Sequence, residues 1–355
     1  MRRISIRIGQ QRGLTLVELM IGLIVGMLVI GAVLYVFLGS RLTYKYNDTM
    51  GRLQENGRMA IDMIGQDLRM AGFIGCRRLA AYLPPPTAAG SISASSIYFS
   101  DEFTNAVKTS LGLSELKLAD SGFVFSHEVT DQVSGTDSLT VLSGSTEIPL
   151  DTPMSSGTAD IVTTDTVPAG PAIISDCRFD SLSLSDTTPT GVPAPAEAFL
   201  VAVAGTTIAH ASYAFQRAYD TDASVTPISA VSYSIRETER NDNNGNTVLA
   251  LFRNNDELIE GARDLCVRYG IAANSSNEAV GEYVEADEVE DWKQVIAVRV
   301  ELLLASVDDN VVDTRAAVPT LCDRPQPDED ELVLNRRMYK VFSTTVGLRN
   351  QVRQP

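Results

Sequence analysis

The feature that most constrains this chain is an apolar run from Leu14 to Leu38, close to the N-terminus. The run contains one charged residue, Glu18, and at about 1.5 Å of rise per residue it is long enough to cross a ~30 Å hydrocarbon layer as one helix. The thirteen residues before it contain four arginines and no acid. Because positive charge beside an apolar run is retained in the cytoplasm, we expect a membrane helix with a cytoplasmic amino end and an extracytoplasmic remainder.

Two details distinguish this run from a conventional secretory signal. Such a signal has a shorter apolar stretch followed by a cleavage site of small residues, whereas here the small residue, Gly13, comes first. A cut after Gly13 would remove the arginines and leave the helix on the mature protein. Glu18 is the second detail, because a carboxylate at the centre of an isolated membrane helix costs roughly 2.5 to 3.5 kcal/mol. The new amine of Leu14, one helical turn away, would neutralise it; the alternative is that Glu18 extends to the lipid headgroups.

The string from Arg12 to Leu19 (RGLTLVEL) resembles the class III signal of type IV prepilins. The resemblance implies that a prepilin peptidase cuts between Gly13 and Leu14 and then N-methylates Leu14. It also implies that Glu18, at the fifth mature position, meets the amino terminus of an adjacent subunit during assembly. Many prepilins have Phe where this chain has Leu14. The alternative is an ordinary signal anchor in which Glu18 is incidental.

A second pattern predicts that the helix continues through residues 39–75. Small and apolar residues recur at intervals of three, four or seven, and charged residues occupy much of the opposite face. Two glycines within 72–76 and three prolines at 84–86 predict the end of the helix. Each of the glycines at 39, 51, 57 and 65 either weakens the helix or marks a close packing contact. The apolar face contains Leu42, Tyr46, Leu53, Gly57, Ala60, Ile64, Leu68 and Ala71.

From about residue 90 the pattern changes to short segments of two-residue period separated by turn-forming residues, which predicts a β-rich head. In the strand predicted at 295–304, the apolar residues at even positions from 296 to 304 should face a core, with Arg299 and Glu301 on the other side. The clearest predicted strands are residues 138–142, 230–235, 248–252, 295–304 and 342–348.

The segment 241–246 (NDNNGN) lies between two predicted strands and is typical of a tight hairpin turn. Asp242, Asn244 and Asn246 also alternate as in the calcium loop of an EF-hand. Arg253, however, stands where that loop requires a bidentate acid, and no glycine stands at its sixth position. We therefore predict a hairpin and leave calcium binding at Asp242–Asn246 as the weaker alternative.

Charge and cysteine content limit the partners of the head. The formal net charge is −16, which makes nucleic acid an unfavourable partner. An even number of cysteines on the oxidising side of the membrane predicts two disulfides, and the spacing alone leaves all three pairings open. With two histidines in the chain and no Cys/His cluster, we expect no metal site and no cofactor. The cysteines are Cys76, Cys177, Cys266 and Cys322.

No group of residues in the sequence has the pattern of a catalytic site. The GxSxG, HExxH and P-loop motifs do not occur. Ser114 and Lys117 form an SxxK element, but the SDN and KTG elements that accompany it in acyl-transfer enzymes are missing. His127 beside Glu128 is more typical of a polar surface than of a catalytic base. We expect a protein that an enzyme processes and that is not itself an enzyme.

Strings spread along the chain resemble one branch of the pilin family, the PilW-type minor pilins. The resemblance implies an α+β, type IV pilin-like fold, in which a long N-terminal helix, transmembrane in its first half, packs on an elaborated antiparallel β-sheet head. It also implies a Cys76–Cys177 bond, with Cys266 and Cys322 as the other pair. The matching strings are RMAIDMIGQDLRMAGFIGC at 58–76, DSLTVLSG at 137–144, IISDCRF at 173–179, DELIEGARDLCVRYG at 256–270, VIAVRVELLLAS at 295–306 and MYKVFSTTVGLRN at 338–350. The expected parts are a cleaved leader at 1–13, a membrane and assembly helix at 14–38, its amphipathic continuation at 39–75 and an extracytoplasmic head at 76–355.

The resemblance further implies a minor pilin, a structural subunit that takes part in starting and assembling type IV pili, and so in twitching motility and adhesion. The expected partners are the prepilin peptidase, other minor pilins, the major pilin, the inner membrane and a PilY-type tip adhesin. The expected location is the inner membrane with the head in the periplasm, and then the pilus, near its tip. Two alternatives are a J-type pseudopilin of a type II secretion system and a membrane-anchored extracytoplasmic binding protein that never polymerises.

Overall fold

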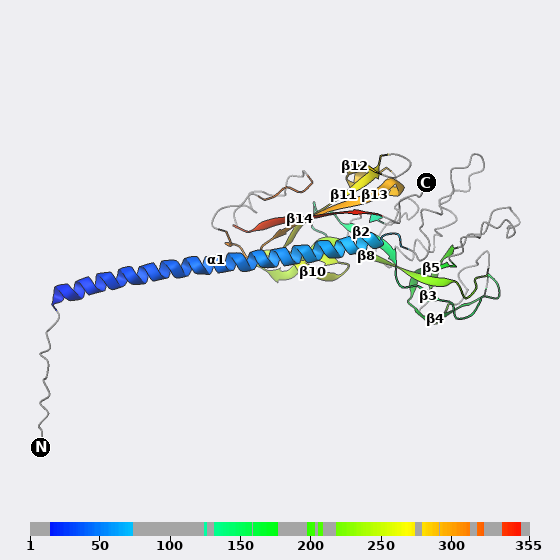
Figure 1. Cartoon of the computed structure of the whole chain (residues 1–355), viewed down its shortest axis with the longest axis horizontal. Helices are drawn as coiled ribbons and strands as arrows, with labels where there is room; N and C mark the ends of the chain where they lie inside the picture. Colours follow the sequence, from blue (N-terminus) through cyan, green and yellow to red (C-terminus); the bar gives the residue numbers. More distant parts are fainter. Residues whose placement is uncertain are drawn as a thin grey trace, which may run out of the picture. The chain divides into compact units, whose positions relative to one another are not determined.

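The structure, a computed structural model, divides the chain into two compact units, Met1–Arg52 and Leu53–Pro355, and each is described by itself. The first unit contains the start of helix α1, and the second contains the rest of that helix and the β-strands of the head (Figure 1). The predicted leader, residues 1–13, lies outside the described part. The structure describes residues 15–73, 124–125, 131–157, 159–176, 197–202, 205–208, 218–273, 279–290, 292–312, 318–322 and 336–348.

Helix α1 is a single helix from Leu16 to Met70. It ends just before Gly72, the first of the glycines that the sequence predicted would end it, and Gly72 adopts a left-handed conformation with φ of +70°. The N–H of Gly72 donates to the carbonyl of Leu142 at 3.0 Å. The backbone therefore leaves the helix to bond with strand β2 of the head.

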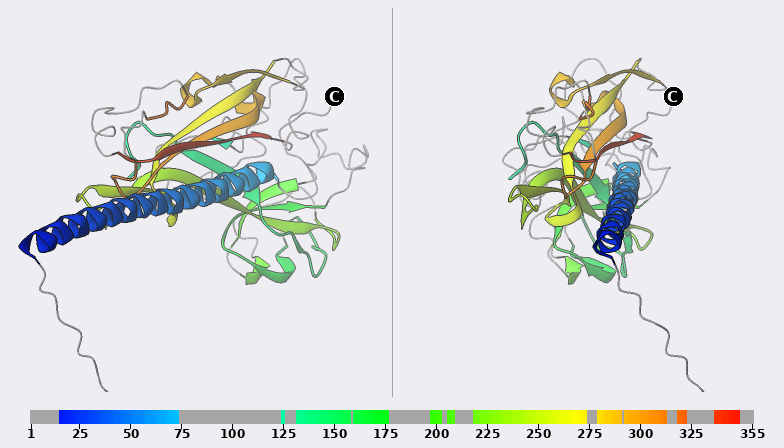
Figure 2. Two further views of the ribbon diagram at one scale, coloured as in Figure 1. Left: turned by 60° about the vertical axis from the view of Figure 1, so that its left-hand side comes forward. Right: turned by 90° about the vertical axis from the view of Figure 1, so that its left-hand side faces the viewer.

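The strands of the head form three antiparallel sheets within the described residues. The four-stranded sheet has the order β12 (Val280–Val284), β11 (Ala262–Ala272), β13 (Val295–Ala305) and β14 (Tyr339–Gly347) (Figure 2). The eight-stranded sheet has the order β1 (Val124–Phe125), β2 (Leu139–Gly144), β8 (Ser224–Asn241), β5 (Gly170–Ser175) and β6 (Glu197–Ala202). Two further strands, β3 (Ile148–Pro149) and β9 (Thr247–Arg253), also pair with β8. Strand β10 (Asp256–Glu260) pairs with β9. The third sheet pairs β4 (Ile161–Val167) with β7 (Gly205–Ile208), and two 3-10 turns, η3 (Ala286–Glu288) and η4 (Trp292–Gln294), lie between β12 and β13.

All five strands that the sequence predicted are present, as β2, part of β8, β9, β13 and β14. The hairpin prediction is also confirmed, because β8 pairs with β9 and Gly245 between them has a φ of +86°. Strand β8 is 18 residues long, much longer than the predicted 230–235. The extra length at its start contributes Val225 to a hydrophobic cluster with buried residues of β4, β5, β7 and the adjoining loops. The buried residues of this cluster are Leu150, Met154, Ile161, Val167, Ala172, Ile174, Ile208, Tyr219, Ala223 and Val225.

The two faces of β13 differ, but not as simply as predicted. Val298, Val300 and Leu302 are fully buried, which confirms the apolar face. On the other face Arg299 is exposed, whereas Leu303 is fully buried in a cluster with Cys266 and Leu321. The prediction of a single core face was therefore incomplete, because a distant segment, 318–322, covers part of the outer face as well.

Candidate functional site: the helix and its attachment to the head

The first turn of α1 holds the acid that the sequence singled out. Thr15 caps the helix, since its Oγ1 accepts the backbone N–H of Glu18 at 3.3 Å. Glu18 lies in this first turn, where a carboxylate interacts favourably with the helix dipole. Gly13 and Leu14, the predicted cleavage and methylation positions, lie outside the described residues, so their processing stays a prediction.

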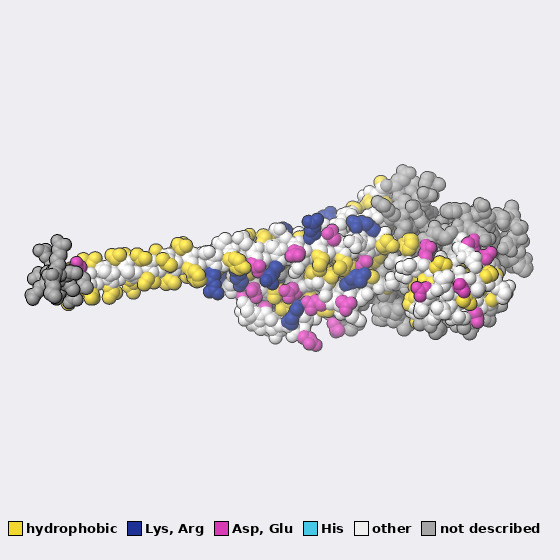
Figure 3. All heavy atoms as spheres, turned by 60° about the horizontal axis from the view of Figure 1, so that its bottom comes forward, with side chains coloured by type: hydrophobic (Ala, Val, Ile, Leu, Met, Phe, Trp, Pro, Cys, Tyr) yellow, Lys and Arg dark blue, Asp and Glu magenta, His cyan; other side chains and the backbone are white. Residues whose placement is uncertain are grey.

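The first part of α1 exposes apolar side chains over its whole surface. Large apolar residues between Leu16 and Leu38 are 53% to 81% exposed. Figure 3 shows hydrophobic side chains all along this part of the helix, with backbone and other atoms visible between them. Of the described residues, α1 alone forms a helix long and apolar enough to cross a membrane. Such a surface requires cover from lipid or from other helices.

The later part of α1 buries one face against its own head. Leu53, Ala60, Ile64 and Leu68 are at most 5% exposed, which confirms the predicted apolar face from residue 53 onward. Leu42 and Tyr46, which continue that pattern toward the N-terminus, are 49% and 40% exposed. Within the second unit, the periodicity thus indicated the correct face of the helix.

At Gly57 the helix packs closely against the four-stranded sheet. A Cβ at this position would lie far inside van der Waals contact with the Phe342 ring of β14. Around Gly39 and Gly51, by contrast, the space within 4 Å of such a Cβ is empty. The sequence left open whether each helical glycine weakens the helix or marks a close packing contact. At Gly57 it marks a close packing contact.

A polar cluster joins the same helix to the eight-stranded sheet. Tyr233 on β8 donates to Asp67 at 2.5 Å, and Arg253 on β9 donates to both Asp67 oxygens at 3.0 and 3.3 Å. Burial and the neighbouring Asp67 carboxylate raise the pKa of Tyr233, and the hydrogen bond to Asp67 raises the pKa of Arg253. Both groups therefore stay protonated, and the cluster links the helix to β8 and β9.

The sequence reasoning did not single out Asp67, although a signal was present. Asp67 directly precedes Leu68 and follows Ala60 by seven positions, so it lies at the border of the buried face. Its partners are 166 and 186 residues away along the chain, and no local pattern points to them.

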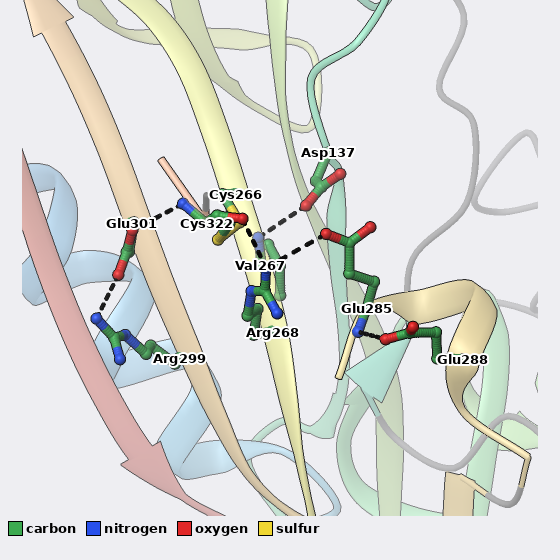
Figure 4. Close-up of a disulfide and its surroundings, with 9 residues drawn as sticks. All are labelled: Asp137, Cys266, Val267, Arg268, Glu285, Glu288, Arg299, Glu301 and Cys322. Atoms are coloured by element: carbon green, nitrogen blue, oxygen red, sulfur yellow. Dashed lines mark hydrogen bonds and ion pairs between the residues drawn. A yellow bond between two sulfur atoms is a disulfide. The ribbon is translucent and has the colours of Figure 1, made fainter. Parts of the chain in front are cut away.

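A disulfide joins Cys266 on β11 to Cys322, with 6.4 Å between the Cα atoms (Figure 4). This is the pairing that the family resemblance implied for these two cysteines. Hydrogen bonds hold the same segment: the Cys322 N–H donates to Glu301 at 3.3 Å, and Arg268 donates to the Cys322 carbonyl at 2.6 Å. The other pair, Cys76 and Cys177, lies outside the described residues.

At the β8–β9 hairpin, the Asp242 carboxylate faces a guanidinium. Asp242 forms an ion pair with Arg337, and both side chains are 2% exposed. Burial raises the pKa of Asp242, but hydrogen bonds from Asn246 and Asn244 and the charge of Arg337 outweigh it and lower the pKa to about 2. Within the described residues, no group of three or more His, Cys, Asp or Glu side chains is arranged to hold a metal ion. The enzyme candidates Ser114, Lys117, His127 and Glu128 lie outside the described residues.

Comparison with known proteins gives two matches. Residues 232–350 match the family described as type IV pilus-assembly protein W (PilW), and residues 8–34 match the prokaryotic N-terminal methylation motif. No curated protein and no solved structure matches the chain. The PilW region contains Tyr233, Arg253 and Phe342, the head residues that contact the helix, and the methylation motif contains Gly13 and Glu18. Both matches are to structural pilus-assembly families and not to enzyme families. With its long apolar helix, its antiparallel head and these two matches, the chain is similar to PilW-type pilins and carries an N-terminal methylation motif.

Proposed function

We propose that this protein is a minor pilin that joins a type IV pilus, or the complex that initiates one, through helix α1. The observation that carries this proposal is the apolar surface from Leu16 to Leu38, which is exposed on all sides and has an acid in its first turn. Lipid covers such a surface before assembly, and a bundle of similar helices covers it afterwards. The head then supplies the contacts that select neighbouring subunits.

Processing creates the positive charge that pairs with the Glu18 carboxylate. A cut between Gly13 and Leu14 leaves an ammonium one helical turn from the carboxylate, and Leu14 is the residue that becomes methylated. In a low-dielectric bundle a paired ammonium and carboxylate are far less costly than either charge alone. Glu18 therefore favours subunits whose neighbours present a processed terminus.

The charge distribution supports the orientation in the membrane. The four arginines of residues 1–13 hold the amino end in the cytoplasm, and the head folds in the periplasm, where the Cys266–Cys322 bond is stable. In this scheme residues 14–38 span the membrane and 76–355 form the head. The partners are the prepilin peptidase, other minor pilins, the major pilin and a PilY-type adhesin near the pilus tip, with roles in twitching motility and adhesion.

Mass spectrometry of the membrane form and of sheared pili tests this function. We expect the mature chain to begin at methylated Leu14 in both fractions. A Glu18→Ala variant should be cleaved and inserted normally but be at least several-fold depleted from pili. Glu55→Ala, which removes an exposed acid from the same helix outside the apolar run, should enter pili normally.

Two outcomes would contradict the proposal. One is a working protein that retains Met1–Gly13, and the other is a Glu18→Ala variant incorporated as well as the wild type. Loss of protein export with normal pili after deletion of the protein would favour the J-type pseudopilin. Absence from sheared pili and from every pilus subcomplex would favour a membrane-anchored binding protein.

A further inference from the structure

Arg337, just before β14, lies among oxygen atoms from two other parts of the chain. Its Nη1 donates to the carbonyl oxygens of Ser306 at 2.8 Å and Val307 at 2.5 Å, in the loop after β13. Its Nη2 donates to the Asp242 carboxylate at the tip of the β8–β9 hairpin. One buried cation thus joins three segments that are far apart in the sequence.

The polar side chains around this cation are themselves tightly held. Asp242 accepts the backbone N–H groups of Asn244 and Asn246, each at 2.8 Å, and the Asn246 amide at 3.1 Å. Asp309, which is 3% exposed, accepts the amides of Asn243 at 2.7 Å and Asn244. The hairpin tip is therefore fastened both to the loop after β13 and to Arg337.

These ligands are of the kind that a calcium ion selects. Carboxylate and carbonyl oxygens converge from several loops, and Asp and Asn alternate at positions 242, 244 and 246. The cation among these oxygens is the guanidinium of Arg337. Its planar group directs N–H donors to several oxygens at once. Without that charge the Asp242 carboxylate would be buried without an ionic partner, which is strongly unfavourable.

We propose that Arg337 takes the place of a metal ion, so that the head holds the β8–β9 hairpin and the start of β14 together without calcium. A guanidinium that is part of the chain is not removed by dilution or by a chelator, whereas a bound ion is. Arg337 lies two residues before β14, the strand whose Phe342 contacts Gly57 of the helix. This role concerns the stability of the head and goes beyond the assembly function proposed above.

Thermal unfolding of the full chain in detergent, with excess calcium or with EDTA, tests the proposal. The fluorescence of Trp292 reports the head, since this single tryptophan packs edge-on against Tyr269 with 4.7 Å between ring centroids. We expect the wild-type midpoint to be the same in both conditions. Arg337→Gln should unfold about 6 °C or more below the wild type in EDTA. Calcium should recover part of that loss, because the oxygens that held the guanidinium become available to an ion.

Two further variants make the result decisive. Arg336→Gln removes the neighbouring arginine, which is exposed and contacts Asn310, and should change the midpoint by no more than about 2 °C in either condition. A double variant, Asp242→Asn with Arg337→Gln, should lose the response to calcium. The proposal is overturned if EDTA destabilises the wild type, if Arg337→Gln unfolds like the wild type, or if calcium leaves Arg337→Gln unchanged.

Discussion

Ile30 and Ile64 lie in the same helix, yet Ile30 is 62% exposed and Ile64 is completely buried. The sequence around Ile30 is apolar on every side, whereas that around Ile64 is apolar on one face only. A helix that is hydrophobic all round must find its partners outside the chain, and an amphipathic helix finds them in its own head. Substitutions in the first part should therefore affect assembly, and those in the second part should affect the stability of the head.

The largest expected difference is between Ile64→Ala and Ile30→Ala. Removing a fully buried isoleucine side chain leaves a cavity, so Ile64→Ala should lower the free energy of unfolding of the head by about 2 to 5 kcal/mol. Ile30→Ala should leave it unchanged. The measurement is urea unfolding of the full chain in detergent, followed by Trp292 fluorescence. If the two variants unfolded at the same urea concentration, the separation of the helix into two roles would be wrong.

A smaller difference is expected between two glycines. Gly57→Ala places a methyl group against the Phe342 ring and should destabilise the head by about 1 to 3 kcal/mol, even though alanine favours the helix. Gly51→Ala, where the space within 4 Å is empty, should cause no loss. The same unfolding assay measures both variants.

The Phe342 ring is the stated cause of the Gly57 effect, and a second substitution tests it. In a Phe342→Ala background, Gly57→Ala should cost about 1 kcal/mol less than it does in the wild type, because the obstructing ring is gone. An equal cost in both backgrounds would show that the helix backbone, and not the ring, is sensitive at this position.

Features with a local period could be predicted from the sequence. The apolar run, the apolar face of the later helix, the five strands and the turn at Gly245 each depend on residues close together in the chain. The same reasoning could not show what covers the buried face. At Gly57 the covering residue is Phe342 of β14, almost 300 residues further along the chain.

Pairings between distant polar groups could not be predicted. The sequence marked Asp242 only as part of a turn, and nothing in it links this acid to Asp309 or Arg337, which the fold brings into the same buried cluster. Likewise, the burial of Leu303 on the outer face of β13 depends on a segment fixed by the Cys266–Cys322 bond. Periodicity describes one element at a time, so it does not identify what a second element will cover.

The smallest expected difference is between two aspartates on α1. Asp67→Asn removes the charge shared by Tyr233 and Arg253 and should cost about 1 to 2 kcal/mol, because the Asp67 and Arg253 side chains are 22% and 36% exposed and solvent screens part of their attraction.

Asp62→Asn is the matched control for this substitution. Asp62 pairs with Arg58 at 3.8 Å, but these side chains are 66% and 83% exposed, so the change should cost less than about 0.5 kcal/mol. Equal effects in the unfolding assay would mean that Asp67 is an ordinary surface acid. We expect Asp67→Asn to lower the free energy of unfolding more than Asp62→Asn does. If this loss becomes smaller in a Tyr233→Phe, Arg253→Gln background, it arises from the contact of Asp67 with those two head residues.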